Sequence, residues 1–121
     1  MVKYEVKMTS IGKDAQTYLS SNSSFILINE KIRPMLADTV VEHTVGELAA
    51  DIVVGDKVKV GKSDFEVTFV GDAANQNLRE EGHCTIVVNK EATMPGQIAV
   101  SGIRPPRLRF GNVIQFYNDN E

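Results

Sequence analysis

The sequence has few of the residues that usually carry cross-links or metal ions. It contains one cysteine, Cys84, two histidines and no tryptophan. A single cysteine cannot form an intramolecular disulfide, so we expect the protein to act in the reducing cytoplasm, with Cys84 as a small core residue. The sequence has neither paired cysteines nor a paired-histidine zinc motif, and it has no glycine-rich phosphate loop. We therefore expect no metal and no cofactor.

Long apolar runs and an excess of positive charge are also missing. The longest unbroken aliphatic and aromatic run is Phe25–Ile28, far short of the roughly 20 residues that cross a membrane. No basic segment precedes an apolar stretch at the start, so we expect neither a secretion signal nor a membrane-embedded protein. Lysine and arginine number 13 against 16 acidic residues, a net charge of −3. This balance argues against a nucleic-acid partner, because such binding depends on phosphate neutralisation.

What remains is the composition of an ordinary globular protein. The 121 residues are 42% apolar and 24% charged, which is too apolar and too close to neutral for a disordered chain. A chain of this length buries roughly two thirds of its unfolded surface, enough for a core without cross-links. We expect a single domain over residues 1–121.

Alternating apolar and polar residues dominate the sequence and predict strands. The first strand begins at Val2 and ends near Ile11, with Val2 on the same face as Tyr4 and opposite Lys3. Glycine allows a hairpin turn at Gly61–Asp64, between two further strands. The other segments expected to contain strands are 25–28, 40–45, 84–88, 98–100 and 110–116, and residues 35–38 lead into the one at 40–45.

Helix signals are fewer. The convincing one covers residues 73–81, with Asp72 as a cap and Gly82 as a left-handed C-terminal residue. A weaker one predicts one or two turns from Asp14 through Leu19, followed by a polar loop over 20–24.

Two distant segments also resemble each other. Residues 54–61 and 110–116 both contain a glycine, then Asp or Asn, then apolar residues two apart. A turn-and-strand pattern that occurs twice is natural in a small barrel. We expect a mainly β fold, a small closed or partly closed β-barrel of about six to eight strands with one or two short helices, because closure removes exposed strand edges.

The two histidines are the candidates for acid–base or nucleophilic chemistry. In a strand over 40–45, His43 would share a face with Val41 and Val45. That pattern is typical of a half-buried core histidine, and also fits a nucleophile on an apolar docking surface. His83 follows Gly82 and fits a helix C-terminal cation, or a ring held by Glu80 and Glu81.

Three arginines crowd residues 104–109. Their pattern fits a phosphate clamp, and also a solvated loop stiffened by two prolines.

Residues 77–85, Asn-Leu-Arg-Glu-Glu-Gly-His-Cys-Thr, resemble the Asn-Leu-Arg-Glu-x-Gly-His-x-Thr signature of the glucitol/sorbitol-specific IIA component of the bacterial phosphotransferase system. The resemblance covers nearly the whole chain, since other short matches follow in the family's order. These are Ile11-Gly12, His43-x-x-Gly46-Glu47-Leu48, the alternating segments between Gly55 and Gly71, and Met94-Pro95-Gly96. The chain departs from the family at Val45, where relatives often carry a second histidine, and in the more basic segment 104–109.

The resemblance implies a phosphoryl carrier, a phosphotransferase that needs no metal or nucleotide. Members of this family accept a phosphoryl group from the phosphohistidine of HPr and pass it to the IIB domain of the membrane transporter. The family's phospho-accepting histidine corresponds to His43. By analogy His83 lies beside it and orients the ring or binds the phosphoryl group. The further candidate binding residues are Gly46, Glu47 and Thr85, with Thr44 as another candidate hydroxyl donor.

Two other functions stay open from the sequence. One is a non-catalytic β-barrel that regulates by binding a partner and derives from the same family. The other is a ligand-binding barrel in which His43 belongs to the core. A carrier must let two partners reach its histidine in turn, so the carrier hypothesis predicts His43 in a shallow apolar patch of modest area.

Overall fold

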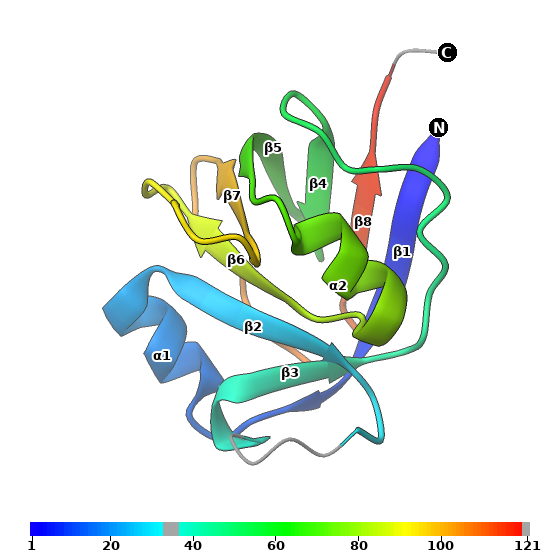
Figure 1. The fold of residues 1–121 in the computed structure, drawn as a ribbon. Coiled ribbons are helices and arrows are strands. Elements are labelled where there is room, and N and C mark those ends of the chain that lie inside the picture. The colour runs from blue at the N-terminus through cyan, green and yellow to red at the C-terminus, as the bar shows by residue number, and fades with distance from the viewer. Residues whose placement is uncertain (33–36, 120–121) are drawn as a thin grey trace.

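The computed structural model describes residues 1–32 and 37–119, and shows a closed barrel of eight strands with two short helices (Figure 1). The strands follow the order β1-β3-β2-β6-β7-β5-β4-β8 around the barrel. The expected mainly β barrel is thus confirmed. The strands are β1 (Val2–Ile11), β2 (Ser24–Asn29), β3 (Val40–His43), β4 (Lys57–Val60), β5 (Ser63–Val70), β6 (Cys84–Val88), β7 (Gln97–Ser101) and β8 (Val113–Tyr117); the helices are α1 (Ala15–Asn22) and α2 (Ala74–Glu81), and a 3-10 turn, η1, spans Ala37–Thr39.

The barrel is built from two halves with the same topology. β1 is antiparallel to β3 and β2 is parallel to β3, just as β5 is antiparallel to β7 and β6 is parallel to β7. Helix α1 connects β1 to β2, as α2 connects β5 to β6. β8 lies beside β1 and β4 beside β5, and these two strands pair with each other. The similar segments 54–61 and 110–116 therefore lead into strands at equivalent places in a repeated arrangement.

Several element boundaries differ from those expected. Helix α1 continues past Leu19 to Asn22, so residues 20–22 are helical and not part of the expected loop, and polar side chains there bond back to the previous turn. Ser20 Oγ donates to the Gln16 carbonyl at 3.2 Å and Asn22 Nδ2 to the Tyr18 carbonyl at 3.3 Å. Residues 35 and 36, expected to lead into the third strand, lie outside the described residues.

The expected caps of the helices are confirmed only in part. Gly82 ends α2 in the left-handed conformation, with φ 61°, as predicted. The N-cap position belongs to Ala73 rather than Asp72, and no side chain caps this end. Asp14 does occupy the N-cap position of α1, also without a side-chain hydrogen bond.

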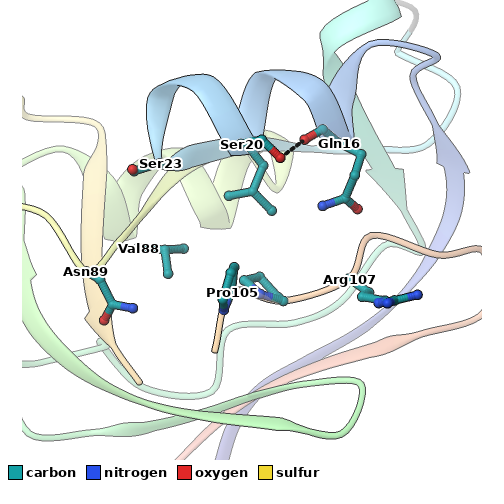
Figure 2. Close-up of a pocket in the computed structure, with 9 residues that line it drawn as sticks. Gln16, Ser20, Ser23, Val88, Asn89, Pro105 and Arg107 are labelled. Carbon is teal, nitrogen blue, oxygen red and sulfur yellow. Dashed lines mark hydrogen bonds between the residues drawn. The ribbon is translucent and has the colours of Figure 1, made fainter. Parts of the chain in front are cut away.

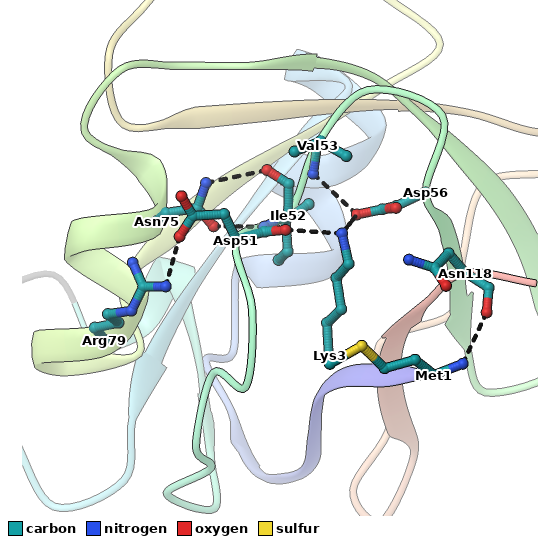
Figure 3. A network of polar contacts seen from close by, with 9 residues as sticks. All are labelled: Met1, Lys3, Asp51, Ile52, Val53, Asp56, Asn75, Arg79 and Asn118. Atoms are coloured by element: carbon teal, nitrogen blue, oxygen red, sulfur yellow. Dashed lines mark hydrogen bonds and ion pairs between the residues drawn. The ribbon is translucent and has the colours of Figure 1, made fainter. Parts of the chain in front are cut away.

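The start of β1 does not follow the expected alternation. Val2 is 47% exposed, whereas Lys3 is only 6% exposed. The register between β1 and β8 shifts between Val2 and Tyr4, which turns Lys3 inward. The buried ammonium group lies 2.7 Å from Asp56 Oδ2, and the two form an ion pair (Figure 3).

The barrel interior is filled by apolar side chains from all eight strands, and Cys84 is buried among them as expected. In the described parts of the chain, no helix has the length and apolar character needed to cross a membrane.

Candidate functional site

His43 is the last residue of β3, and its side chain points into the barrel. It pairs with Met8 of β1 on one side and with Asn29 of β2 on the other. Val41 also points inward, as predicted. Val45 is 69% exposed, because the chain has left the strand after His43. The expected common face therefore includes Val41 and His43 but not Val45.

The ring of His43 is completely buried, with 0% of the residue exposed. The prediction that it lies in a shallow apolar patch open to partners is therefore wrong for this conformation. The physical reason is its inward direction: its strand partner Met8 is also fully buried, and the residues directly opposite each other in a sheet share a face.

Both ring nitrogens of His43 face main-chain carbonyl oxygens. Nδ1 lies 2.8 Å from the oxygen of Thr44, and Nε2 lies 2.9 Å from the oxygen of Gly82. A neutral imidazole has one N–H and can donate to only one of these oxygens, whereas the doubly protonated ring donates to both. A neutral ring therefore holds one unshared electron pair against a carbonyl oxygen.

Gly82 permits this close packing. A Cβ atom at this position would lie 2.1 Å from Asn29 Oδ1 and 2.7 Å from His43 Cε1. Asn29 Oδ1 is itself buried and has no hydrogen-bond partner in the described part of the chain. The sequence marked Gly82 as a helix end and as part of the family signature, and nothing in it placed Asn29 beside His43. The register of the parallel pair β2–β3 would have been needed to find that contact.

Tyr4 is a further neighbour that the sequence did not single out. Its ring meets His43 edge-to-face, with centroids 6.3 Å apart and planes at 89°. Burial, with a smaller contribution from Cys84, raises the pKa of Tyr4 to about 12. Burial likewise raises the pKa of Cys84 to about 12. A backbone hydrogen bond from Ile98 has a smaller effect that lowers this pKa. Both groups therefore stay neutral at neutral pH, and Tyr4 does so in contact with the imidazole.

His83 is half-buried and adjoins the site through the main chain, since it follows the glycine whose carbonyl meets His43. Within the described residues, the aromatic contact of the His43 ring is with Tyr4 and not with His83. Thr85 is half-exposed between the buried residues Cys84 and Ile86. Because side chains alternate along a strand, Thr85 points to the outer face, away from the interior that holds His43.

Gly46 and Glu47 lie in the segment that follows His43. Glu47 is exposed. Gly46 crosses β1 so closely that a Cβ atom would lie 2.7 Å from Val6 Cγ1 and 3.0 Å from the Glu5 carbonyl oxygen. Close backbone approach is thus a structural reason for glycine here. Thr44 Oγ1 accepts a hydrogen bond from the Lys7 amide at 3.0 Å, which also secures this segment to β1.

The segment from Thr44 to Asp56 is fastened to both β1 and α2 (Figure 3). Lys3 Nζ donates to the Asp51 carbonyl at 2.8 Å as well as to Asp56. Asn75, in the first turn of α2, accepts from the amide of Ile52 at 2.8 Å and donates to its carbonyl at 3.0 Å. The N-terminal end of α2 is therefore held to this segment, while its C-terminal end contacts His43 through Gly82.

No cluster of three or more histidine, cysteine or acidic residues suited to a metal ion occurs within residues 1–32 and 37–119. The chemical groups of the site are an enclosed imidazole, the ring of Tyr4, the side chain of Asn29 and the main-chain carbonyls of Thr44 and Gly82.

Comparison with known proteins relates this chain to one family. The family model of the PTS system glucitol/sorbitol-specific IIA component matches residues 3–115. Proteins named PTS system glucitol/sorbitol-specific EIIA component from Shigella flexneri and Escherichia coli K12 are each 33% identical over 122 residues, covering 99% of this chain and 98% of the relative. A crystal structure of a PTS system IIA component from Enterococcus faecalis V583 has a TM-score of 0.82 at 23% identity, covers 93% of this chain and 98% of its own, and shares the fold. The chain belongs to the glucitol/sorbitol-specific IIA component family of the phosphotransferase system.

Proposed function

We propose that this protein is a cytoplasmic phosphoryl carrier that accepts a phosphoryl group on His43 from phospho-HPr and passes it to the IIB domain of a membrane sugar transporter. The observation that carries the proposal is the family match over residues 3–115. His43 is the residue at which the sequence matches the family's phospho-accepting histidine. Its imidazole suits the role, because a neutral ring is a good nucleophile near pH 7.

We assign the attack to Nε2, because the carbonyl that covers it belongs to a distant segment, whereas the carbonyl that covers Nδ1 belongs to the next residue in the chain. Nδ1 lies against the carbonyl of Thr44, the next residue in the chain, so an N–H on Nδ1 has a local partner and leaves the electron pair on Nε2. That electron pair then faces the Gly82 oxygen at 2.9 Å. The Gly82 carbonyl must therefore move away before Nε2 can attack.

Transfer therefore requires an open conformation in which the corner between α2 and β6 moves away from His43. In that conformation Nε2 attacks the phosphorus atom of the phosphohistidine of HPr, and the phosphorus–nitrogen bond of the donor breaks as the new one forms. Such a transfer asks the protein for positioning and for stabilisation of charge. The Nδ1–H bond to Thr44 would hold the ring in place throughout, and His83 would reach the phosphoryl group from the displaced corner.

A second function is favoured by the closed ring itself. A barrel whose histidine keeps both nitrogens against carbonyl oxygens can serve as a non-catalytic regulatory or binding module of the same family. In that case His43 is a core residue that links β3 to the end of α2.

Phosphorylation with purified components separates the two functions. The protein is incubated with phosphoenolpyruvate, enzyme I and HPr, and acid-labile, alkali-stable phosphate is measured on the wild type, His43→Ala and His83→Ala. The carrier function predicts label on the wild type, none on His43→Ala and reduced label on His83→Ala. Circular dichroism of each variant confirms that it is folded.

The other outcomes have definite meanings. An unlabelled wild type would support the regulatory module. Label that persists in folded His43→Ala and disappears in His83→Ala would assign the phosphoryl group to His83. Transfer onward is tested by adding the IIB domain and measuring loss of label from the carrier.

A further inference from the structure

Four positively charged side chains share one surface cleft on this acidic protein. The cleft has a volume of about 380 Å³ and is lined by Lys62, Arg104, Arg107 and Arg109, together with the polar side chains of Ser63 and Asn112. Lys62, Ser63 and Arg104 also line an adjoining hollow of about 410 Å³. The cations come from two separate parts of the chain, the β4–β5 turn and the β7–β8 connection, so the fold brings them together.

None of these four cations forms an ion pair with a residue in the described ranges, 1–32 and 37–119. The ion pairs there engage other basic residues, namely Lys3, Lys13, Lys57, Lys59 and Arg79. Asp64 borders the adjoining hollow, but its carboxylate lies 3.0 Å from Lys59 Nζ. The cleft thus keeps its positive charge, and a cleft lined by one sign of charge attracts ions of the other sign.

The backbone that carries the arginines is held in place. Pro106 and Leu108 are buried, whereas Arg107 and Arg109 are exposed, so the segment anchors every second residue and directs the arginines outward. The Leu108 amide donates to Gln16 Oε1 at 2.9 Å. Figure 2 shows Gln16 and Arg107 at the same end of the neighbouring pocket. Asn112 Nδ2 also donates to the Arg107 carbonyl at 3.0 Å.

This anchoring separates the cleft from an ordinary solvated loop. A ligand that binds flexible side chains must immobilise them, and holding the backbone beforehand reduces that cost. Guanidinium groups present paired N–H donors that match the oxygens of phosphate. Ser63 and Asn112 add neutral polar groups at the same cleft.

We propose that this cleft binds a small anion that carries phosphate groups. Its volume accommodates an organic phosphate, and its four cations compensate a ligand with two or more negative charges. The lining of the cleft includes neither His43 nor the residues that enclose its ring, and the proposal does not depend on phosphoryl transfer there.

Direct titration tests the proposal. Pyrophosphate, inorganic phosphate and citrate are titrated into the full-length protein at constant ionic strength, and binding is followed by calorimetry and by amide chemical shifts. We expect saturable binding of pyrophosphate, tighter than that of phosphate or citrate, with shifts concentrated at residues 62–63 and 104–112. The double variant Arg104→Ala/Arg107→Ala should bind pyrophosphate at least about tenfold more weakly, since hydrogen bonds to charged groups are lost.

The matched control is Lys7→Ala/Lys90→Ala, which removes the same charge from two exposed positions outside the cleft. This control should keep the affinity of the wild type. Equal loss in both double variants, or no saturable binding by the wild type, would show only general electrostatic attraction and overturn the proposal. Citrate binding as tight as pyrophosphate binding would overturn the assignment to phosphate.

Discussion

The Nε2 atom of His43 lies 2.9 Å from the carbonyl oxygen of Gly82, a residue 39 positions further along the chain. This contact joins the end of β3 to the end of α2. It also encloses the His43 ring, although the proposed function requires partner proteins to reach that ring. The same contact therefore holds this corner together and limits access to His43.

Gly82→Ala should destabilise the protein by about 2 kcal/mol or more. An L-residue in the left-handed conformation costs about 1–2 kcal/mol, and the added Cβ would also lie 2.1 Å from Asn29 Oδ1. Urea unfolding measures the change. Gly55→Ala is the control for positive φ without crowding: φ is 98° there, against 61° at Gly82, and a Cβ added at Gly55 would meet no atom within 4 Å.

The control should show only the backbone part of the loss. Asn29→Ala in the Gly82→Ala background should recover part of the remaining loss by removing the clashing oxygen. A loss in Gly82→Ala that Asn29→Ala leaves unchanged would contradict the close packing at Gly82.

The buried ion pair between Lys3 and Asp56 makes a second prediction. Removing one partner leaves an uncompensated buried charge, so Lys3→Met and Asp56→Leu should each cost about 3 kcal/mol or more. The double variant should cost much less than the sum of the two, and denaturant unfolding of all four proteins gives the coupling. The exposed pair Lys57 and Glu66, 3.1 Å apart, is the control, with an expected coupling below about 1 kcal/mol.

This ion pair shows one limit of the sequence pattern. Alternation placed Tyr4 and Lys3 on opposite faces of the first strand, and it predicted the barrel class. It placed Lys3 outside, because one shift in strand register reverses the faces and the pattern does not mark where the shift occurs. Asp56, the partner that makes burial of the ammonium tolerable, is 53 positions away in the sequence.

The candidate site was predictable to a similar extent. The family resemblance identified His43 and the run through His83, and alternation placed Val41 and His43 on one face. The enclosure of the ring depends on three contacts between distant segments: Tyr4 from β1, Asn29 from β2 and Gly82 from the end of α2. Such contacts follow from strand order and register, which a local pattern does not contain.

Stability should fall as the pH rises above about 9. The pKa values of Cys84 and Tyr4 rise from 9.0 and 10.0 to about 12 on folding. Between these values the unfolded chain loses protons that the folded chain keeps, so each group lowers stability by up to about 1.4 kcal/mol per pH unit. Below about pH 8 both groups are almost fully protonated in both states and contribute almost no slope.

Tyr4→Phe separates the contribution of the tyrosine. Its hydroxyl is buried without a hydrogen-bond partner in the described part of the chain, so its removal should be neutral or stabilising by about 1 kcal/mol at pH 7. The slope above pH 10 should also decrease. A loss of several kcal/mol at pH 7 would indicate that the hydroxyl has a partner in solution.

Chemical modification tests the closed state of His43 directly. Diethyl pyrocarbonate acylates accessible imidazole nitrogens, so half-exposed His83 should react quickly while fully buried His43 reacts at least about tenfold more slowly. The two sites are distinguished by peptide mass after digestion, with His83→Gln as a control in which only His43 can react. Gly82→Ala should accelerate modification of His43, because the added Cβ would lie 2.7 Å from its ring and forces the corner apart. Adding HPr should also accelerate modification of His43 if docking opens the corner. If neither Gly82→Ala nor HPr changes the protection of His43, the core-histidine function explains the site better.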